Sequence, residues 1–339
     1  MMKSILLTGT AGFIGSNFVP YFLEKYSDYK LINLDLLTYA GNLENLKECV
    51  DNPRYKFIKG DICNRELVEF IFNEYDIEGV IHFAAESHVD NSIKNPGVFI
   101  ETNVNGTFTL IDVAYKYWME KPFTYKEKYK KCRFHHISTD EVYGTLSDDP
   151  KDLFTEETPY APNSPYSASK ASSDMVVRSY QETYGLNTVI TNCSNNYGPK
   201  QHDEKLIPTI IRKALANEAI PIYGDGKNIR DWLYVLDHCK GIDRVYHTGK
   251  EANVYNIGGR NERTNLQIVD RICTILDERV PKEKSYKELI TFVEDRAGHD
   301  RRYAIDATKL ENELGWKADE NFDTGIVLTI DWYLEKYAI

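Results

Sequence analysis

The sequence feature that most constrains the fold is a glycine-rich turn that directly follows a short apolar run. The apolar run SILLT is followed by GTAGFIG, in which Gly9, Gly12 and Gly15 lie three residues apart. Glycines at this spacing allow a tight turn, a close approach of the backbone to a pyrophosphate, and close packing of a helix on a strand. Phe13 and Ile14 would open that helix, whose free N–H groups favour phosphate. The pattern therefore predicts a strand, a dinucleotide-binding turn and a helix.

A carboxylate lies at the position where such a turn needs one. Asp35 comes 20 residues after Gly15, at the end of a second apolar run, where a carboxylate binds the hydroxyl groups of an adenosine ribose. It would repel a 2′-phosphate, and the following Leu36 and Leu37 offer no arginine to receive one. A glycine turn that merely caps a helix is the alternative for the glycines alone, but it does not explain Asp35. The sequence therefore predicts NAD, rather than NADP, as the cofactor.

The first half of the chain alternates short β-rich runs with longer helical stretches. The expected strands are residues 4–8, 30–35, 55–59, 79–83, 133–138 and 187–192, and the main expected helices are residues 13–26, 65–73, 96–117 and 166–184. Strands that alternate with helices imply parallel crossovers, so we expect an α/β fold with a Rossmann-type, doubly wound parallel sheet. Residues 1–192 would then form an NAD-binding domain.

The regular alternation of strands and helices ends after Asn192, where prolines and glycine turns separate shorter elements. We expect residues 193–339 to form a smaller mixed α/β domain that binds the substrate and ends in a helix near residues 325–337. Segments near residues 232–248 are expected to return to the first domain.

Composition argues against several classes of function. Lys and Arg number 41 against 52 Asp and Glu, a formal net charge of −11, which argues against a nucleic-acid-binding surface. No apolar run approaches the ~18 residues that span a membrane, and the N-terminal run breaks at Thr8, too early for a targeting segment. The six cysteines are scattered without a Cys-x-x-Cys pair, and neither they nor the histidines show metal-binding spacing. We therefore expect a cytoplasmic protein with free thiols and without a metal.

One tyrosine–lysine pair is distinguished by its position. The spacing Tyr-x-x-x-Lys occurs seven times in the chain, so the spacing alone predicts little. Only Tyr166 begins a long expected helix after the fifth strand, with Ser164 and Pro165 as a helix-start signal. Lys170 lies one turn later on the same face, where its ammonium group would lower the pKa of the phenol and make it a general base. A solvated helix face is the alternative for any single pair.

Several longer stretches resemble a known family. They read FAAESHVD from Phe83, STDEVYG from Ser138, SNNYGP from Ser194, EKLIP from Glu204, RDWLYV from Arg230 and DRAGHDR from Asp295. Together with the glycine turn and the Tyr166–Lys170 pair, they resemble the extended short-chain dehydrogenase/reductase superfamily of nucleotide-sugar-modifying enzymes, and within it the dTDP-glucose 4,6-dehydratases. The resemblance runs from about residue 3 to about residue 330. It implies NAD, a dTDP-glucose substrate, and a homodimer formed through the helices at residues 96–117 and 166–184, which carry apolar groups on more than one face.

Asp140 and Glu141 separate the reactions within this superfamily. A 4-epimerase needs only a hydroxyl and the Tyr/Lys pair, whereas removing water across C5–C6 also needs a base for the C5 hydrogen and an acid for the C6 hydroxyl. Neighbouring carboxylates can serve both roles if their surroundings separate their pKa values. The resemblance implies that Glu141 is the base, that Asp140 is the acid, and that Thr139 holds the C4 oxygen beside Tyr166. An acidic turn that faces water is the alternative.

The resemblance also implies a set of contact residues. Beyond the glycine turn, Asp35, Tyr166 and Lys170, the expected cofactor contacts are Thr38, Asp61, Ile62, Phe83, Ala84, Ala85, Ser87, Thr102 and Asn195. The expected substrate contacts are Ser87, Thr139, Asn195, Lys205, Leu206, Pro221, Tyr223, Arg230, Asn265, Arg296 and His299. Arg230 and Arg296 are expected on the diphosphate, because guanidinium groups match phosphate oxygens. A nucleotide-sugar epimerase or decarboxylase stays open as an alternative, as does a non-catalytic NAD-binding regulator on the same fold.

Overall fold

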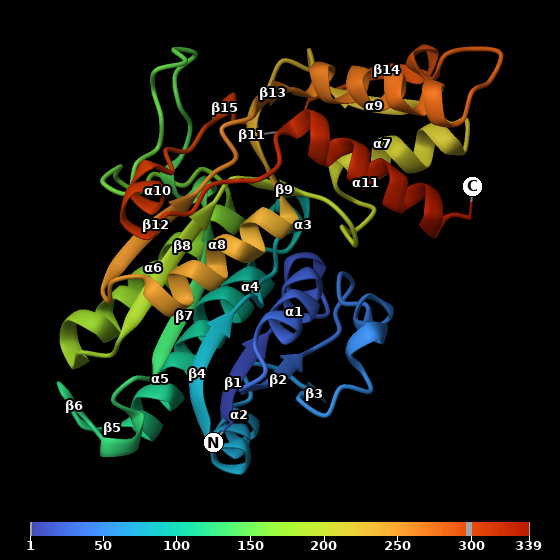
Figure 1. The fold of residues 1–339 in the computed structure, drawn as a ribbon. Helices are drawn as coiled ribbons and strands as arrows, with labels where there is room; N and C mark the ends of the chain where they lie inside the picture. The colour runs from blue at the N-terminus through green and yellow to red at the C-terminus, as the bar shows by residue number, and fades with distance from the viewer. Residues whose placement is uncertain (1, 296–299, 339) are drawn as a thin grey trace.

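A seven-stranded parallel sheet forms the centre of the molecule, with the strand order β12-β8-β7-β4-β1-β2-β3 (Figure 1). The computed structural model describes residues 2–295 and 300–338. The strands of this sheet are β1 (Lys3–Thr8), β2 (Tyr29–Asp35), β3 (Tyr55–Lys59), β4 (Ile77–His82), β7 (Arg133–Thr139), β8 (Thr188–Cys193) and β12 (Asn253–Ile257). Most of their residues are buried, as in parallel sheets that helices cover on both faces. The predicted doubly wound Rossmann sheet is confirmed.

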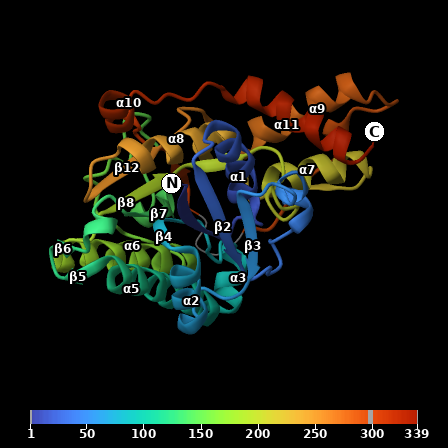
Figure 2. The same cartoon turned by 60° about the horizontal axis from the view of Figure 1, so that its bottom comes forward.

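Two helical layers cover this sheet, one on each face (Figure 2). On one face α1 packs beside α8, and Phe18 and Cys239 of these helices belong to one apolar core. On the other face α5 lies between α2 and α6, around the buried Trp118. The helices are α1 (Phe13–Lys25), α2 (Arg65–Tyr75), α3 (Val89–Lys94), α4 (Pro96–Phe99), α5 (Thr107–Trp118), α6 (Pro165–Tyr184), α7 (Leu206–Leu215), α8 (Val235–Thr248), α9 (Asn265–Arg279), α10 (Thr308–Leu314) and α11 (Phe322–Lys336).

The strand order fixes where a ligand binds. From β1 the chain runs to β2 and β3 on one side, and it then crosses to β4 and β7 on the other side. At such a reversal the loops after neighbouring strands turn to opposite faces, so a crevice opens at the carboxyl ends of the strands. The glycine turn after β1 lies at this crevice.

The expected helix at residues 96–117 is not regular. It is divided into α4, a π-helical segment (Ile100–Gly106) and α5. Asn103 in the π-helical segment donates from Nδ2 to Ser169 Oγ at 2.8 Å, and its Oδ1 accepts from the backbone N–H of Glu86 at 2.8 Å. The expected helix is therefore present, and it contains a wider turn where Asn103 makes these contacts with other elements.

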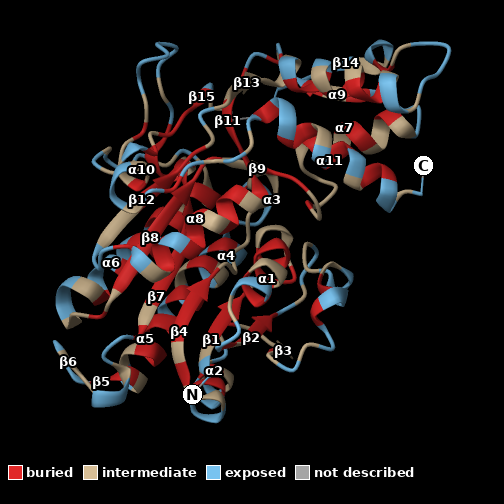
Figure 3. Ribbon diagram, viewed as in Figure 1, coloured by how far each residue is buried: buried red, intermediate tan, exposed pale blue. Residues whose placement is uncertain are grey.

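The residues after β8 form most of a second, smaller lobe, drawn at the top of Figure 1. Its helices α7, α9 and α11 share an apolar core with β10, and Figure 3 shows their buried sides turned toward one another. Between these elements, α8 and β12 return to the large sheet. The remaining strands are β5 (Met119–Lys121), β6 (Thr124–Tyr125), β9 (Asn195–Tyr197), β10 (Ile220–Tyr223), β11 (Ile229–Tyr234), β13 (Glu262–Thr264), β14 (Ile290–Val293) and β15 (Arg302–Tyr303). Within the described residues, no helix combines the length and the apolarity that crossing a membrane requires.

Candidate active site

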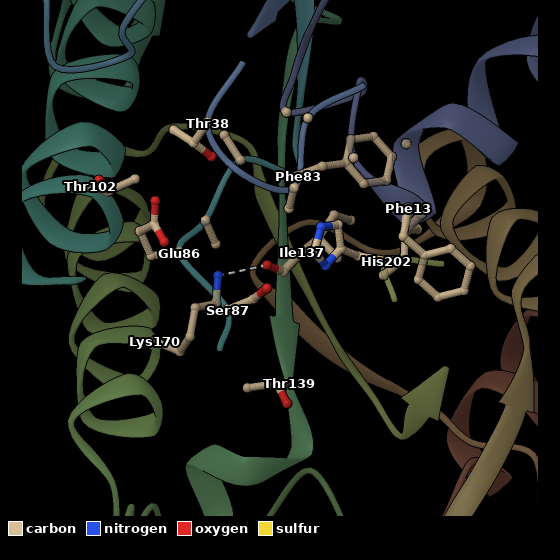
Figure 4. Close-up of a pocket in the computed structure, with 18 of the residues that line it drawn as sticks. Phe13, Thr38, Phe83, Glu86, Ser87, Thr102, Ile137, Thr139, Lys170 and His202 are labelled. Carbon is tan, nitrogen blue, oxygen red and sulfur yellow. Dashed lines mark hydrogen bonds between the residues drawn. The ribbon is translucent and has the colours of Figure 1, made fainter. Parts of the chain in front are cut away.

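A cavity of about 310 Å³ lies at the carboxyl ends of β1, β2, β4, β7 and β8. All the residues expected to contact the cofactor line it, and so do the five expected catalytic residues and Lys205. Figure 4 shows side chains from the glycine turn, from β7 and from α6 converging on this space. In residues 2–295 and 300–338, no three His, Cys, Asp or Glu side chains are grouped to hold a metal ion.

The glycine turn is packed so closely that larger residues would not fit at two of its positions. Gly9 has a φ of +72°, and a Cβ there would lie 2.5 Å from the Cα of Ala84. A Cβ on Gly15 would lie 2.4 Å from the Cα of Thr10. Gly12 is the N-cap of α1 and has no side chain, so the first N–H groups of the helix stay open to the cavity. The turn therefore fits a pyrophosphate.

Asp35 is held rigidly at the end of β2. Its Oδ2 accepts from the backbone N–H of Ala11 and its Oδ1 from that of Leu37, both at 2.8 Å. Burial raises the pKa of Asp35, while these two N–H groups act in the opposite direction. Because the carboxyl lines the cavity beside the glycine turn, its remaining lone pairs are placed for the ribose hydroxyls of a dinucleotide.

The two acidic residues form the turn that follows β7. Thr139 ends the strand, and its Oγ1 accepts from the backbone N–H of Glu141 at 3.3 Å. Asp140 is only 2% exposed, and its Oδ2 has no hydrogen-bond partner among the described residues. Burial and the charge of Glu141 raise the pKa of Asp140 well above its usual value. The surroundings of Asp140 therefore favour its neutral, protonated form, and the alternative of an acidic turn that faces water does not describe it.

Tyr166 and Lys170 lie on the first turns of α6. Ser164 caps this helix, and its side chain and that of Ser167 each accept from the other residue's backbone N–H. Lys170 donates from Nζ to the carbonyl oxygen of Ile137 at 2.8 Å, shown as a dashed line in Figure 4. Burial lowers the pKa of Lys170 to about 8.

The pKa of Tyr166 corrects an expectation from the sequence. Lys170 was expected to lower it, but burial and the neighbouring Glu141 raise it well above its usual value. Sequence spacing does not reveal this, because it shows neither burial nor the position of a carboxylate on another element.

The remaining expected substrate residues that the structure describes do not line this cavity. Leu206 and Asn265 begin α7 and α9, and Pro221 and Tyr223 are on β10. Arg230, on β11, donates to the carbonyl oxygens of residues 229, 300 and 301, and its guanidinium lies over the ring of Tyr303. Arg296 and His299 lie outside the described residues.

The cavity also contains residues that the sequence did not single out. Glu86 follows β4, and His202 comes from the loop before α7 (Figure 4). Glu204, on the same loop, also lines the cavity. Burial and the charge of Glu204 raise the pKa of Glu86. The place of Glu86 just after a strand was a usable signal, because the carboxyl ends of parallel strands share one edge. The loop gave no such signal, since its position depends on the packing of the second lobe.

Comparisons with known proteins agree with this site. The family described as GDP-mannose 4,6 dehydratase matches residues 6–329. A dTDP-glucose 4,6-dehydratase from Escherichia coli is 55% identical over 337 residues, which cover 97% of this chain and 92% of that protein. A crystal structure of dTDP-glucose 4,6-dehydratase from Bacillus anthracis in complex with NAD has a TM-score of 0.87 and 47% identity, and covers 99% of this chain and 98% of that one.

A second crystal structure is similar over the same length of chain. The dTDP-glucose 4,6-dehydratase of Streptomyces venezuelae, crystallised with NAD, is 42% identical with a TM-score of 0.88, and covers 99% of this chain and 98% of that one. These similarities extend over both lobes, so they include the elements that surround the cavity as well as the glycine turn. The chain belongs to the family of dTDP-glucose 4,6-dehydratases.

Proposed function

We propose that this protein converts dTDP-glucose to dTDP-4-keto-6-deoxyglucose and water, with NAD as a cofactor that is reduced and reoxidised in each turnover. The observation that carries this proposal is the buried Asp140, whose pKa is raised well above its usual value, beside Glu141 in the same cavity as the glycine turn and Tyr166. A 4-epimerase has no step that needs a carboxylic acid and a carboxylate side by side.

The first step removes hydrogen from C4 of the glucose. Tyr166 takes the proton of the C4 hydroxyl, and Thr139 donates a hydrogen bond to the same oxygen. NAD supplies a hydride acceptor for C4 and later the hydride donor for C6. Because burial and Glu141 raise the pKa of Tyr166, its phenolate needs positive charge nearby, which Lys170 and the oxidised nicotinamide ring would both provide.

The second step removes water across C5 and C6. The C4 ketone acidifies the C5 hydrogen, and Glu141 takes it as a proton. Asp140 gives its own proton to the C6 hydroxyl, so that the C6–O bond breaks and water leaves. A hydride at C6 and a proton from solvent at C5 then complete the 4-keto-6-deoxy sugar. Tyr166 and Glu141 release their protons to solvent, and Asp140 takes one up.

The nucleotide would lie toward the second lobe. We assign NAD to the domain formed by residues 1–192 and the nucleotide sugar to residues 193–339, with α8 and β12 returning to the first domain. Asn195 and Lys205 line the cavity from the side of the second lobe, and Lys205 Nζ donates to the carbonyl oxygen of Ser87 at 3.1 Å. Arg230 and Arg296 are assigned to the diphosphate.

Product analysis tests this proposal directly. The purified protein is incubated with the dTDP, UDP and GDP forms of glucose, and each product is analysed by mass spectrometry and NMR. The proposal predicts that dTDP-glucose loses one water and gains a C6 methyl group. A product of unchanged mass would favour an epimerase, and recovery of all three substrates unchanged would favour the non-catalytic regulator.

We also propose a homodimer. Val98, Ile100, Phe108 and Met175 are 42 to 48% exposed on α4, the π-helical segment, α5 and α6, which pack together. An apolar face of this kind is typical of a surface that a second copy covers. Sedimentation of wild type and of Phe108→Glu tests it: the wild type should be dimeric and the variant monomeric. Phe292→Glu, at a phenylalanine exposed on β14 in the other lobe, is the matched control.

A cytoplasmic location completes the proposal. All six cysteines are free thiols, and five of them are buried. Free thiols persist in a reducing compartment. Fractionation of the producing cells should find the protein with cytoplasmic markers.

A further inference from the structure

A buried polar cluster lies beside Lys170, outside the cavity wall. Asp174 is one turn after Lys170 on α6, and the two side chains are 0% and 3% exposed. Between them stands the ring of His136 from β7, which is also fully buried. Its Nε2 lies 3.2 Å from Asp174 Oδ1 and 3.4 Å from Lys170 Nζ.

The carboxyl of Asp174 is fixed from its other side. Its Oδ2 accepts from the hydroxyl of Ser138 and from that of Tyr160, both at 2.9 Å. These donors favour the carboxylate over the neutral acid. Asp174 is not in the cavity wall, so a substrate or cofactor has no direct contact with it.

A buried ammonium group requires a negative charge nearby. Taking a lone lysine out of water is costly, and removing the partner of a buried ion commonly costs several kcal/mol. The titratable groups that face Lys170 are Asp174 on its own helix, His82 on β4, His136 on β7 and Cys193 on β8. Burial keeps the pKa of both histidines well below its usual value and raises the pKa of Cys193 to about 12. At neutral pH these three groups carry no charge, which leaves Asp174.

The pKa values of Asp174 and Lys170 define the pH range in which both side chains are charged. Burial raises the pKa of Asp174 to about 6, against the effect of Lys170 and of the two hydroxyl donors. Burial lowers the pKa of Lys170 to about 8, against the effect of Asp174. Between these values both groups are charged.

We propose that Asp174 is a positioning residue for the active site: it is the counter-ion of Lys170, which it faces across the ring of His136, and it holds the lysine in its charged form. The consequence for catalysis rests on the proposed function, in which charged Lys170 stabilises the phenolate of Tyr166. The electrostatic claim itself does not depend on the reaction.

The pKa of Lys170 is measured without substrate. The full chain is exposed to a trace of acetic anhydride over a range of pH, with an internal amine standard, and acetylation of Lys170 is followed by peptide mass spectrometry. The wild type should titrate near pH 8, and Asp174→Asn should titrate lower by about one pH unit or more. Asp174→Glu should restore most of the wild-type value. Asp243→Asn, a buried aspartate on α8, is the matched control and should leave it unchanged.

A second variant covers the case in which Asp174→Asn does not fold. Ser138→Ala combined with Tyr160→Phe keeps Asp174 but removes both donors to Oδ2, so the carboxyl should bind its proton more tightly and the Lys170 titration should move down. A Lys170 titration equal to that of the wild type, in whichever of these variants folds, would overturn the proposal.

The pH profile of turnover separates this role from a structural one. With dTDP-glucose, Asp174→Asn should move the basic limb of kcat to lower pH and leave the KM for the sugar nearly unchanged. A loss of kcat by the same factor at every pH, with the basic limb at its wild-type pH, would indicate a structural role and contradict the proposal. If the wild type forms no keto sugar, the proposed function fails, while the acetylation result still decides the charge of Lys170.

Discussion

Asp140 and Glu141 are joined by one peptide bond, yet Asp140 is 2% exposed whereas Glu141 is only partly buried at the cavity wall. The charge of Glu141 is itself a cause of the raised pKa of Asp140. The negative charge of Glu141 therefore favours the protonated form of Asp140. This is the division of protonation states that an acid and a base in one elimination require.

Replacing either carboxyl by a carboxamide should stop the reaction after C4 oxidation. Glu141→Gln and Asp140→Asn keep the shape of each side chain but remove its proton transfer, so elimination should slow by ~10²–10⁴-fold. Rapid-mixing absorbance should show reduced cofactor accumulating in both variants. Near-normal turnover in Glu141→Gln would show that the base is assigned wrongly. Asp243→Asn, on α8 and outside the cavity wall, should catalyse both steps at wild-type rates under conditions where it is folded.

Asp35 should determine the choice of cofactor. Its carboxylate is oriented by the backbone N–H groups of Ala11 and Leu37, so Asp35→Ala removes an oriented, charged acceptor. NAD affinity should fall roughly 10- to 100-fold, the usual effect of losing a hydrogen bond to a charged group, while NADP affinity should hold or rise. Calorimetric titration with both cofactors measures this. Equal NAD affinities in variant and wild type would place the ribose elsewhere.

Asp243 should stabilise the contact between α1 and α8. It accepts from Lys25 at 2.6 Å and from Tyr21 at 2.8 Å, and it pairs with His247. Burial alone would raise the pKa of Asp243, but these partners lower it to about 2. Asp243→Asn should lower the free energy of unfolding at pH 7 by about 2 kcal/mol.

The same carboxyl gives this prediction a pH dependence. A folded-state pKa below the unfolded value contributes stability that is present above the unfolded pKa of about 4 and lost as the pH falls toward 2. Urea unfolding of wild type and Asp243→Asn should therefore converge below pH 4. A difference that stays constant down to pH 2 would mean that the carboxylate charge is not its source.

His82 should make the protein sensitive to mild acid. Its ring is buried between the hydroxyls of Thr8 and Thr107, at 2.7 and 2.9 Å. Because burial holds its pKa well below the unfolded value of about 6.5, protonation favours the unfolded chain as the pH falls below 6.5. Between pH 7.5 and 5.5, the wild type should lose about 1 kcal/mol more unfolding free energy than His82→Gln. An equal loss of unfolding free energy in the wild type and in His82→Gln would show that His82 does not take up a proton on unfolding.

The main sheet could be predicted from the sequence because its signals are local. A strand buried on both faces is a short apolar run, and five of the six expected strands differ from the observed ones by one or two residues while the strand at residues 55–59 matches β3. The seventh strand of the sheet, β12, was not expected. The glycine turn is equally local. The π-helical segment around Asn103 could not be predicted, because the partners of that amide are residues of α6 and of the loop after β4.

The candidate site was predictable where its residues follow strands of the sheet, as Thr139 and Asp140 do. It was not predictable where a loop from the second lobe supplies the wall, as with His202. The pKa of Tyr166 was expected to fall and is raised, because burial and the place of Glu141 follow from tertiary packing. Asp174 was missed for the same reason: only the folded chain brings His136 between it and Lys170.

The most direct test of the central claim is the fate of a deuterium atom placed at C4 of dTDP-glucose. If Tyr166 starts the oxidation and Asp140 and Glu141 carry out the elimination, the wild type should deliver the label to C6 of the same molecule. Hydrogen from solvent should enter at C5, which NMR of the product in light and heavy water resolves. Label that appears in solvent, or a C5 position that keeps its original hydrogen, would contradict the account.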